Sequence, residues 1–264
     1  MRIIWVIFSI LLIFMLACED DKITESPGQP GFNIEDIEID NLNAYPIFGY
    51  IQTGGVLAPT IDGSAADDIW QLATSYQVET KEGKDGFSAI VNIKALYDNW
   101  YAYFLITWED TSESSQTEDD GFAIMWNQNS ADFISCANFC HAANSMSTDI
   151  NEFADVWKWG ALSTDSSGYL DDGFLDDEGF QDDTGLSIND IIAKGIYEDG
   201  IRILEMKRRL KTVVEPENSD VEFNPESNAN VDFHLAVFNN SQGIEHAVSQ
   251  KVHVLHFLQL IGIN

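Results

Sequence analysis

Short runs of β-branched and aromatic residues, separated by clusters of glycine, asparagine and aspartate, dominate the sequence from about Tyr45 onward. Residues 89–97 and 101–108 are two such runs, and Asp98 and Asn99 between them favour a tight turn. Helical patterns are scarce and short, and residues 65–73 contain one of them. Regularly spaced strands with turn signals predict an all-β domain, a β-sandwich with long loops and few short helices.

The chain carries 13 lysine and arginine residues against 44 aspartate and glutamate residues, which gives a formal net charge of −31. Such a surface repels nucleic acid, because phosphate binding requires clustered basic side chains. However, 45% of the residues are hydrophobic and 12% are aromatic, so the composition is not that of an acidic disordered chain. We therefore expect a packed domain with an acidic surface and no nucleic-acid partner.

The amino terminus has the pattern of an export signal. Arg2 precedes an apolar run over residues 3–17, which is shorter than the roughly 20 residues of a membrane-spanning helix but suits a secretory signal. The run ends in Met-Leu-Ala-Cys at residues 15–18, which resembles a bacterial lipobox, where cleavage precedes a lipidated cysteine. We predict a lipoprotein signal peptide over residues 1–17 and lipidation of Cys18, which would anchor the protein at the periplasmic or cell-surface side of a membrane. An uncleaved amino-terminal anchor is the alternative.

The segment that follows the signal is polar and rich in proline and glycine. Residues 26–31 read Ser-Pro-Gly-Gln-Pro-Gly, and isoleucines alternating with acidic residues come next. This composition predicts an acidic tether over residues 18–44 and places the folded domain at residues 45–264.

Two of the three cysteines lie in the segment Cys136 to His141, which reads Cys-Ala-Asn-Phe-Cys-His. Covalent haem attachment uses the pattern Cys-x-x-Cys-His, in which the thiols bond to the porphyrin and the histidine reaches the iron. Here one extra residue separates the thiols. In an exported protein the same two cysteines could instead form a disulfide, whereas the scattered positions of the other histidines disfavour a zinc site. Spacing alone leaves covalent haem and a disulfide both open.

Several short motifs occur in a fixed order over most of residues 55–250. They are Ile61-Asp62-Gly63, Asp68-Ile69-Trp70, Val91 to Asp98, Trp108 to Thr111, Phe122 to Trp126, Cys136 to His141, Asp155 to Ala161, Lys207 to Thr212 and His246 to Ser249. Their order resembles the haem-binding domain family that includes the gamma subunits of ethylbenzene dehydrogenase and of related molybdenum enzymes of the dimethyl sulfoxide reductase type. The resemblance implies an immunoglobulin-like or carbohydrate-module-like jelly roll that holds one haem for electron transfer.

The resemblance also implies iron ligands. The gamma subunits hold a b-type haem with a methionine and a lysine, and Met125 and Lys207 occupy the matching places in this chain. The family's usual histidine between two tryptophans is replaced by Lys158, which puts a ligand role at that position in doubt.

Cytochrome-like relatives carry Cys-x-x-x-Cys-His, and this favours a c-type haem here. Cys136 and Cys140 are then the thioether anchors, and His141 is the proximal iron ligand. Candidates for the distal ligand are Met125, Met146 and Lys207, in that order, because a thioether sulfur opposite histidine raises the reduction potential.

Seven acidic residues fall between Asp171 and Asp183. Calcium prefers oxygen ligands at such density, but the spacing does not fit an EF-hand loop, so a solvated loop is favoured over a calcium site. The acidic surface suits a basic redox partner such as a soluble cytochrome.

These patterns favour an exported, lipid-anchored haem protein that transfers electrons, as a stand-alone cytochrome or as the haem subunit of a molybdenum oxidoreductase. We expect no catalysis by the chain itself, which has no Gly-x-Ser-x-Gly motif. The alternative is a carbohydrate-binding β-sandwich lipoprotein with a Cys136–Cys140 disulfide, since the segment from Ile61 to Trp70 also resembles family-9-type carbohydrate-binding modules.

Overall fold

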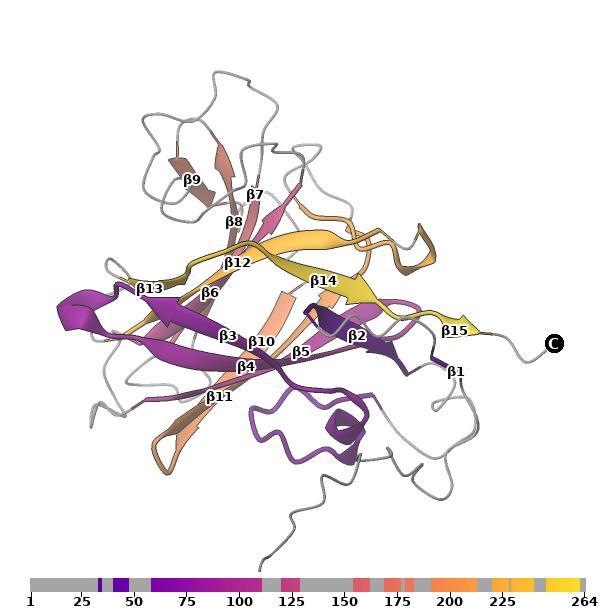
Figure 1. Cartoon of the computed structure of the whole chain (residues 1–264), viewed down its shortest axis with the longest axis horizontal. Helices are drawn as coiled ribbons and strands as arrows, with labels where there is room; N and C mark the ends of the chain where they lie inside the picture. Colours follow the sequence, from indigo (N-terminus) through magenta and orange to yellow (C-terminus); the bar gives the residue numbers. More distant parts are fainter. Residues whose placement is uncertain are drawn as a thin grey trace, which may run out of the picture. The chain divides into compact units, whose positions relative to one another are not determined.

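The computed structural model describes residues 33–34, 40–47, 58–110, 120–128, 154–161, 169–176, 179–182, 191–212, 220–227, 229–239 and 246–261 (Figure 1). By its contacts the chain forms two units, Met1–Phe32 and Asn33–Asn264, and every described residue lies in the second. Among these residues, no helix is long and apolar enough to cross a membrane.

The described residues form strands and three single turns of 3₁₀ helix, which confirms the all-β prediction. The expected helical turn within residues 65–73 is the 3₁₀ turn η1 (Asp68–Leu72). The other elements are β1 (Asn33–Ile34), β2 (Leu42–Pro46), β3 (Tyr76–Lys81), η2 (Lys84–Gly86), β4 (Ala89–Tyr97), β5 (Tyr101–Glu109), β6 (Gly121–Asn127), β7 (Ala154–Gly160), β8 (Tyr169–Asp176), β9 (Gly179–Asp182), β10 (Ile191–Glu198), β11 (Ile201–Arg209), η3 (Pro225–Ser227), β12 (Val231–Phe238), β13 (His246–Ser249), β14 (His253–Phe257) and β15 (Leu260–Ile261).

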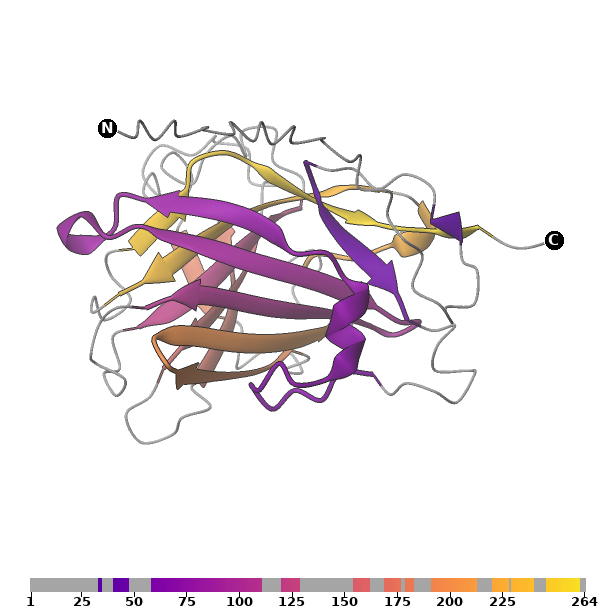
Figure 2. The same cartoon turned by 60° about the horizontal axis from the view of Figure 1, so that its bottom comes forward.

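The strands form two layers that face each other. One layer has the order β10-β11-β5-β4-β3, and the other has the order β9-β8-β7-β6-β12-β13. Strands β2 and β14 connect β4 to β12, and β3 also pairs with β13, so the layers are linked through both pairings. Figure 2 shows the first layer from its outer side, with the second layer behind it.

Aromatic side chains from both layers meet between them. The ring centroid of Phe104 on β5 lies 5.6 Å from that of Trp126 on β6 and 5.9 Å from that of Trp157 on β7. The ring centroids of Trp108 on β5 and Phe122 on β6 also lie 5.9 Å apart. Alternate residues of each strand therefore point into one shared core, as in a β-sandwich.

A second apolar cluster covers the outer face of β4, β5 and β11, and it contains Trp70 of η1. The carboxylate of Glu205 on β11 fixes this segment in place. Its Oε2 accepts hydrogen bonds from the backbone N–H groups of Asp62 (3.0 Å) and Gly63 (2.8 Å), and its Oε1 accepts one from the Trp70 indole (2.9 Å). Gly63 has φ +86°, a conformation that favours glycine. The Ile61-Asp62-Gly63 motif thus has a structural role.

Replacing Glu205 with glutamine is expected to lower the free energy of unfolding by about 1–3 kcal/mol, because an amide nitrogen cannot accept the buried hydrogen bonds that a carboxylate oxygen accepts. Urea denaturation of both proteins measures this loss. Glu198→Gln, at an exposed position on β10, is the matched control and should change stability little. Equal stability of Glu205→Gln and the unchanged protein would contradict the role assigned to Glu205.

The domain includes residues that the sequence pattern assigned to the tether. Strand β2 begins at Leu42, and the side chains of Leu42 and Ala44 are buried in the shared core. β2 pairs in parallel with both β14 and β4. The first core strand therefore starts three residues before the expected boundary at Tyr45.

Candidate functional site

Met125 lies on the outer face of the layer that contains β6, β7 and β12. Its neighbour Trp126 points into the shared core, so Met125 points away from it. In register it lies opposite His234 of β12 and Val156 of β7. Although they are on an outer face, Met125, Val156 and His234 are 4%, 9% and 1% exposed. We call these three residues the Met125 face.

The Met125 face lies close to the end of the β6–β7 pair. The last pair in register is Asn127 with Ala154, and Met125 lies two residues before that end. Residues 128–153 connect the two strands, and this connection contains Cys136, Cys140, His141 and Met146. These four residues, like Cys18, lie outside the described residues. The described residues at the two ends of β6 and β7, Asn127 and Ala154, lie two residues along their strands from Met125 and Val156.

His234 is a member of this face that the sequence pattern did not single out. Its Nδ1 lies 3.0 Å from Ser249 Oγ, which also accepts a hydrogen bond from the Leu235 backbone N–H. Burial lowers the pKa of His234 to about 4, so the ring is neutral at neutral pH. Its isolated position in the sequence gave no signal, because only the strand register brings it opposite Met125.

Lys207 does not share a face with Met125. It follows Met206, which points into the shared core, and its ammonium lies 4.6 Å from the centre of the Tyr101 ring on the outer face of the other layer. Both layers and the core separate Met125 from Lys207. The structure thus does not bring together the two residues that match the ligands of the gamma subunits.

Lys158 of β7 is on the same outer face as Met125, two residues from Val156 along the strand. Its ammonium lies 5.4 Å from the centre of the Phe238 ring. A methionine–lysine ligand pair on this layer would have to use Lys158.

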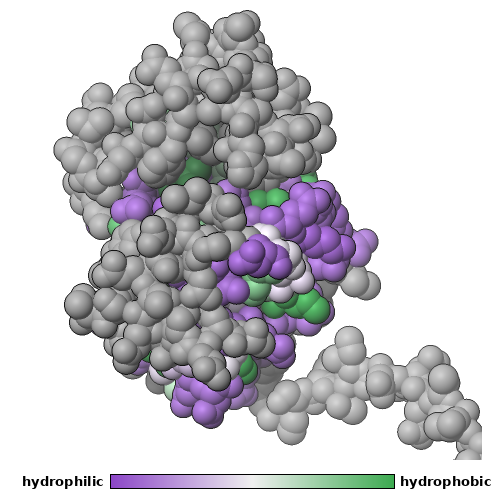
Figure 3. All heavy atoms as spheres, turned by 90° about the vertical axis from the view of Figure 1, so that its left-hand side faces the viewer, coloured by the Kyte–Doolittle hydropathy of each residue, from purple (hydrophilic) through white to green (hydrophobic). Residues whose placement is uncertain are grey.

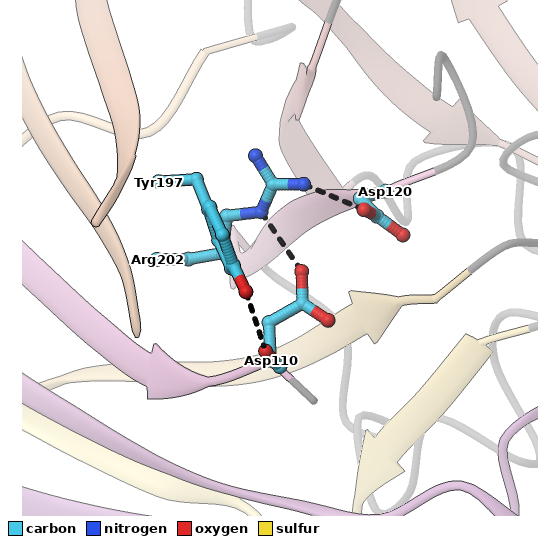
Figure 4. Close-up of polar contacts among 4 residues, drawn as sticks. All are labelled: Asp110, Asp120, Tyr197 and Arg202. Carbon is cyan, nitrogen blue, oxygen red and sulfur yellow. Dashed lines mark hydrogen bonds and ion pairs between the residues drawn. The ribbon is translucent and has the colours of Figure 1, made fainter. Parts of the chain in front are cut away.

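In the described part of the chain, two buried arginines, Arg202 and Arg208, form ion clusters near the two ends of β11. Figure 4 shows the first, in which Arg202 donates to Asp110 (3.0 Å) and to Asp120 (2.6 Å) and lies against the Tyr197 ring. Asp110 and Asp120 are the described residues on either side of the acidic segment 111–119. Arg202 thus holds the two ends of that segment together, which is a structural role.

The second cluster surrounds Arg208, whose side chain is fully buried. Its Nη2 lies 3.2 Å from Asp155 Oδ2 and 3.0 Å from Asp220 Oδ2, and its Nη1 donates to the Val221 carbonyl. Carboxylate oxygens of Asp155, Asp220 and Asp172 lie within 4.8 Å of one another, close enough to share a cation. The Arg208 guanidinium already bridges two of them. Among the described residues of the acidic stretch considered for calcium, Asp172 is the one that reaches this cluster.

We expect His253 of β14 to make the free energy of unfolding depend on pH. It is 4% exposed, its Nδ1 lies 2.8 Å from the Tyr76 hydroxyl, and burial, with smaller contributions from Lys251 and His234, lowers its pKa to about 4. Because the ring is protonated more easily in the unfolded chain, with a pKa of about 6.5, its contribution is complete above that pH and is lost as the pH falls toward 4. We expect a loss of about 1–2 kcal/mol after allowance for solvent screening.

His253→Gln isolates this contribution. The difference in unfolding free energy between the unchanged protein and His253→Gln should shrink as urea denaturation is repeated from pH 7 down to pH 4.5. A difference that stays constant over this range would contradict the assignment.

The comparisons with known proteins agree in part with the resemblance expected from the motifs. Residues 67–191 match the family model described as ethylbenzene dehydrogenase, whereas no curated protein matches the chain. Among solved structures, a family 9 carbohydrate-binding module from Caldicellulosiruptor kristjanssonii in complex with glucose is 12% identical, with a TM-score of 0.46, and the match covers 85% of this chain and 98% of that one. The same module in complex with cellotriose is 13% identical, with a TM-score of 0.44, over 84% and 99%. The chain is thus similar to the ethylbenzene dehydrogenase family over the part that contains Met125 and the segment from Cys136 to His141.

Proposed function

We propose that the chain is an exported, lipid-anchored haem protein that transfers electrons and has no catalytic activity of its own. The observation that carries the proposal is the position of Met125. A buried thioether lies on an outer sheet face, two residues from the strand end where the connection with Cys136, Cys140 and His141 begins. In this proposal Cys136 and Cys140 would attach the haem, and His141 and Met125 would bind its iron.

The surroundings of Met125 suit such a role. Val156 beside it is apolar and buried, and Ala236, Phe238 and Val248 form an apolar cluster on the same layer that also contacts Ala123. An apolar environment excludes water and favours the less charged, reduced form of a haem iron. Haem would supply one-electron chemistry, and the residues of this face would set its potential and limit access of solvent.

The acidic composition supports a particular kind of partner. The described surface seen from the left-hand side of Figure 1 is mainly hydrophilic (Figure 3). With a formal charge of −31, long-range attraction favours a basic redox protein, such as a soluble cytochrome, and a molybdenum catalytic subunit is the other candidate partner. The lipid on Cys18 would hold the protein at a membrane facing the periplasm or the cell surface.

Haem staining of a denaturing gel tests the covalent attachment. The full chain, produced in a host that matures c-type cytochromes, should give a stained band, and a Cys136→Ser, Cys140→Ser variant should give none. An unstained band from the unchanged chain would overturn covalent attachment. If the visible absorption is then lost on denaturing extraction, the haem is b-type, and if it is absent from the outset, the protein binds no haem.

The alternative function, a carbohydrate-binding lipoprotein without haem, is favoured by one observation. A cavity at the turn between β4 and β5 is lined by the exposed Trp100. This alternative predicts a colourless protein in which Cys136 and Cys140 form a disulfide, so that no free thiol reacts in the denatured, unreduced chain. Visible absorption from bound haem would exclude it as the sole function.

A further inference from the structure

A cavity of about 920 Å³ lies at one end of the sandwich, where the β4–β5 turn meets the chain that follows β11. Its volume is at the upper end of the ~300–1,000 Å³ range of small-molecule sites. The buried Phe223 lies at its wall, and Gln259 closes it from the side of the carboxyl-terminal strand. The Met125 face belongs to a different sheet face, so this cavity, which we call the hairpin-end cavity, is a separate site.

Trp100 presents a large aromatic surface at the hairpin-end cavity. It is 73% exposed, the highest value among the described large hydrophobic residues. The turn that carries it is rigid, because Asp98 Oδ1 accepts hydrogen bonds from the backbone N–H groups of Trp100 and Tyr101, both at 2.7 Å, and the Trp100 carbonyl accepts one from Leu210. An exposed aromatic ring on a fixed turn provides a stacking platform for a flat, partly apolar ligand at little entropic cost.

Two basic and two acidic side chains line the cavity, and one of the acidic ones, Asp98, already accepts hydrogen bonds from Trp100, Tyr101 and Tyr103. Arg209 and Lys211 line the cavity and are exposed, and Lys207 lies over the ring of Tyr101, another lining residue. Among the described residues, neither Arg209 nor Lys211 takes part in an ion pair. In a chain with only 13 basic residues and a charge of −31, this is a place where an anionic group can approach.

The remaining lining groups suit hydroxyl groups. The side chains of Asn99 and Asn224 can donate and accept hydrogen bonds, and the exposed Glu226 can accept them. Glu226 also limits how much negative charge the site tolerates. A ligand with one carboxylate per unit carries less negative charge than a polyphosphate, so the acidic surface repels it less.

We propose that the hairpin-end cavity binds an acidic oligosaccharide, a short chain of sugars that carry uronic carboxylates. Trp100 stacks on the apolar face of a sugar ring, Arg209 and Lys211 bind the carboxylate, and the amides and Glu226 bind hydroxyl groups. This inference does not rest on the haem proposal, because the two sites share no residue. It would give a membrane-anchored electron carrier a means of staying at an acidic polysaccharide.

Isothermal titration of the full chain with a trigalacturonate tests the proposal, with cellotriose as a neutral ligand of equal length and the methyl ester of trigalacturonate as a ligand without charge. We expect binding of trigalacturonate, with at least tenfold weaker binding of both uncharged ligands. Trp100→Ala should weaken binding of trigalacturonate at least tenfold. Arg209→Gln with Lys211→Gln should remove the preference for trigalacturonate over its ester.

Lys81→Gln, at an exposed lysine on β3, is the charge control and should bind as the unchanged chain does. All substituted side chains are exposed, so each variant should fold. Circular dichroism of each variant checks this. Absence of trigalacturonate binding, equal binding of the three ligands, or unchanged affinity in Trp100→Ala would each overturn the proposal. None of these outcomes bears on haem, which is read from the visible spectrum.

Discussion

Replacing Arg208 with methionine is expected to lower the free energy of unfolding by about 3–5 kcal/mol, the range observed when one partner of a buried ion pair is removed. Arg208 is fully buried, as is the side chain of Asp155, and the side chain of Asp220 is 4% exposed. Without the guanidinium, these carboxylates keep their desolvation cost but lose the charge that offsets it. The Val221 carbonyl loses a donor at the same time. Urea denaturation at pH 7 measures the loss.

Arg209→Met is the matched control for Arg208→Met, because the adjacent arginine is exposed and makes no ion pair within the described part of the chain. It should change the free energy of unfolding by less than about 0.5 kcal/mol. Adding Asp155→Asn and Asp220→Asn to Arg208→Met should recover part of the loss, since the buried charges are then removed together. A stability of Arg208→Met within about 1 kcal/mol of the unchanged protein would contradict the proposed role of the ion cluster.

Strands could be predicted where an alternating or continuously apolar run of residues is bounded by turn residues. Residues 89–97 and 101–108 become β4 and β5, which pair as the hairpin expected from Asp98 and Asn99. Each run alternates or is continuously apolar and is bounded by turn residues, and a strand in a sandwich needs no further information to form.

Face assignments were harder to obtain from the sequence. Lys207 and Arg208 look alike as part of one basic run, but alternation places Met206 and Lys207 on opposite faces and returns Arg208 to the core side. The carboxylates that offset the cost of burying the Arg208 charge belong to Asp155 and Asp220, which lie on other segments of the chain. Only the pairing of β11 with β5 and the packing of the second layer bring them together, and periodicity carries no such long-range information.

The candidate site was predictable only in part for the same reason. Met125 could be singled out from its motif, and its place on an outer face follows from alternation with Trp126. His234 could not, because its position opposite Met125 depends on the register between β12 and β6. The difference between Lys207 and Lys158 is likewise a matter of which layer each strand joins.

Met125→Leu is expected to have the largest effect on the proposed haem. Leucine keeps the apolar volume of this buried position but removes the thioether sulfur, so the iron would lose its distal ligand while the protein stays folded. We expect the low-spin spectrum to become high-spin and the reduction potential to fall by on the order of 0.1 V or more, within the roughly 0.8 V that axial ligands span in haem proteins. Absorption spectroscopy and redox titration of the purified full chain measure both changes.

Met146→Leu is the control for Met125→Leu, because it removes the same sulfur from the other methionine that the sequence nominates. Its spectrum and potential should match those of the unchanged protein, whereas Met125→Leu should differ from both. The two variants separate a ligand role from a packing role, because loss of packing alone would lower the free energy of unfolding without changing the spin state. A low-spin spectrum in Met125→Leu together with a high-spin spectrum in Met146→Leu would transfer the distal role to Met146 and contradict the one assigned to the Met125 face.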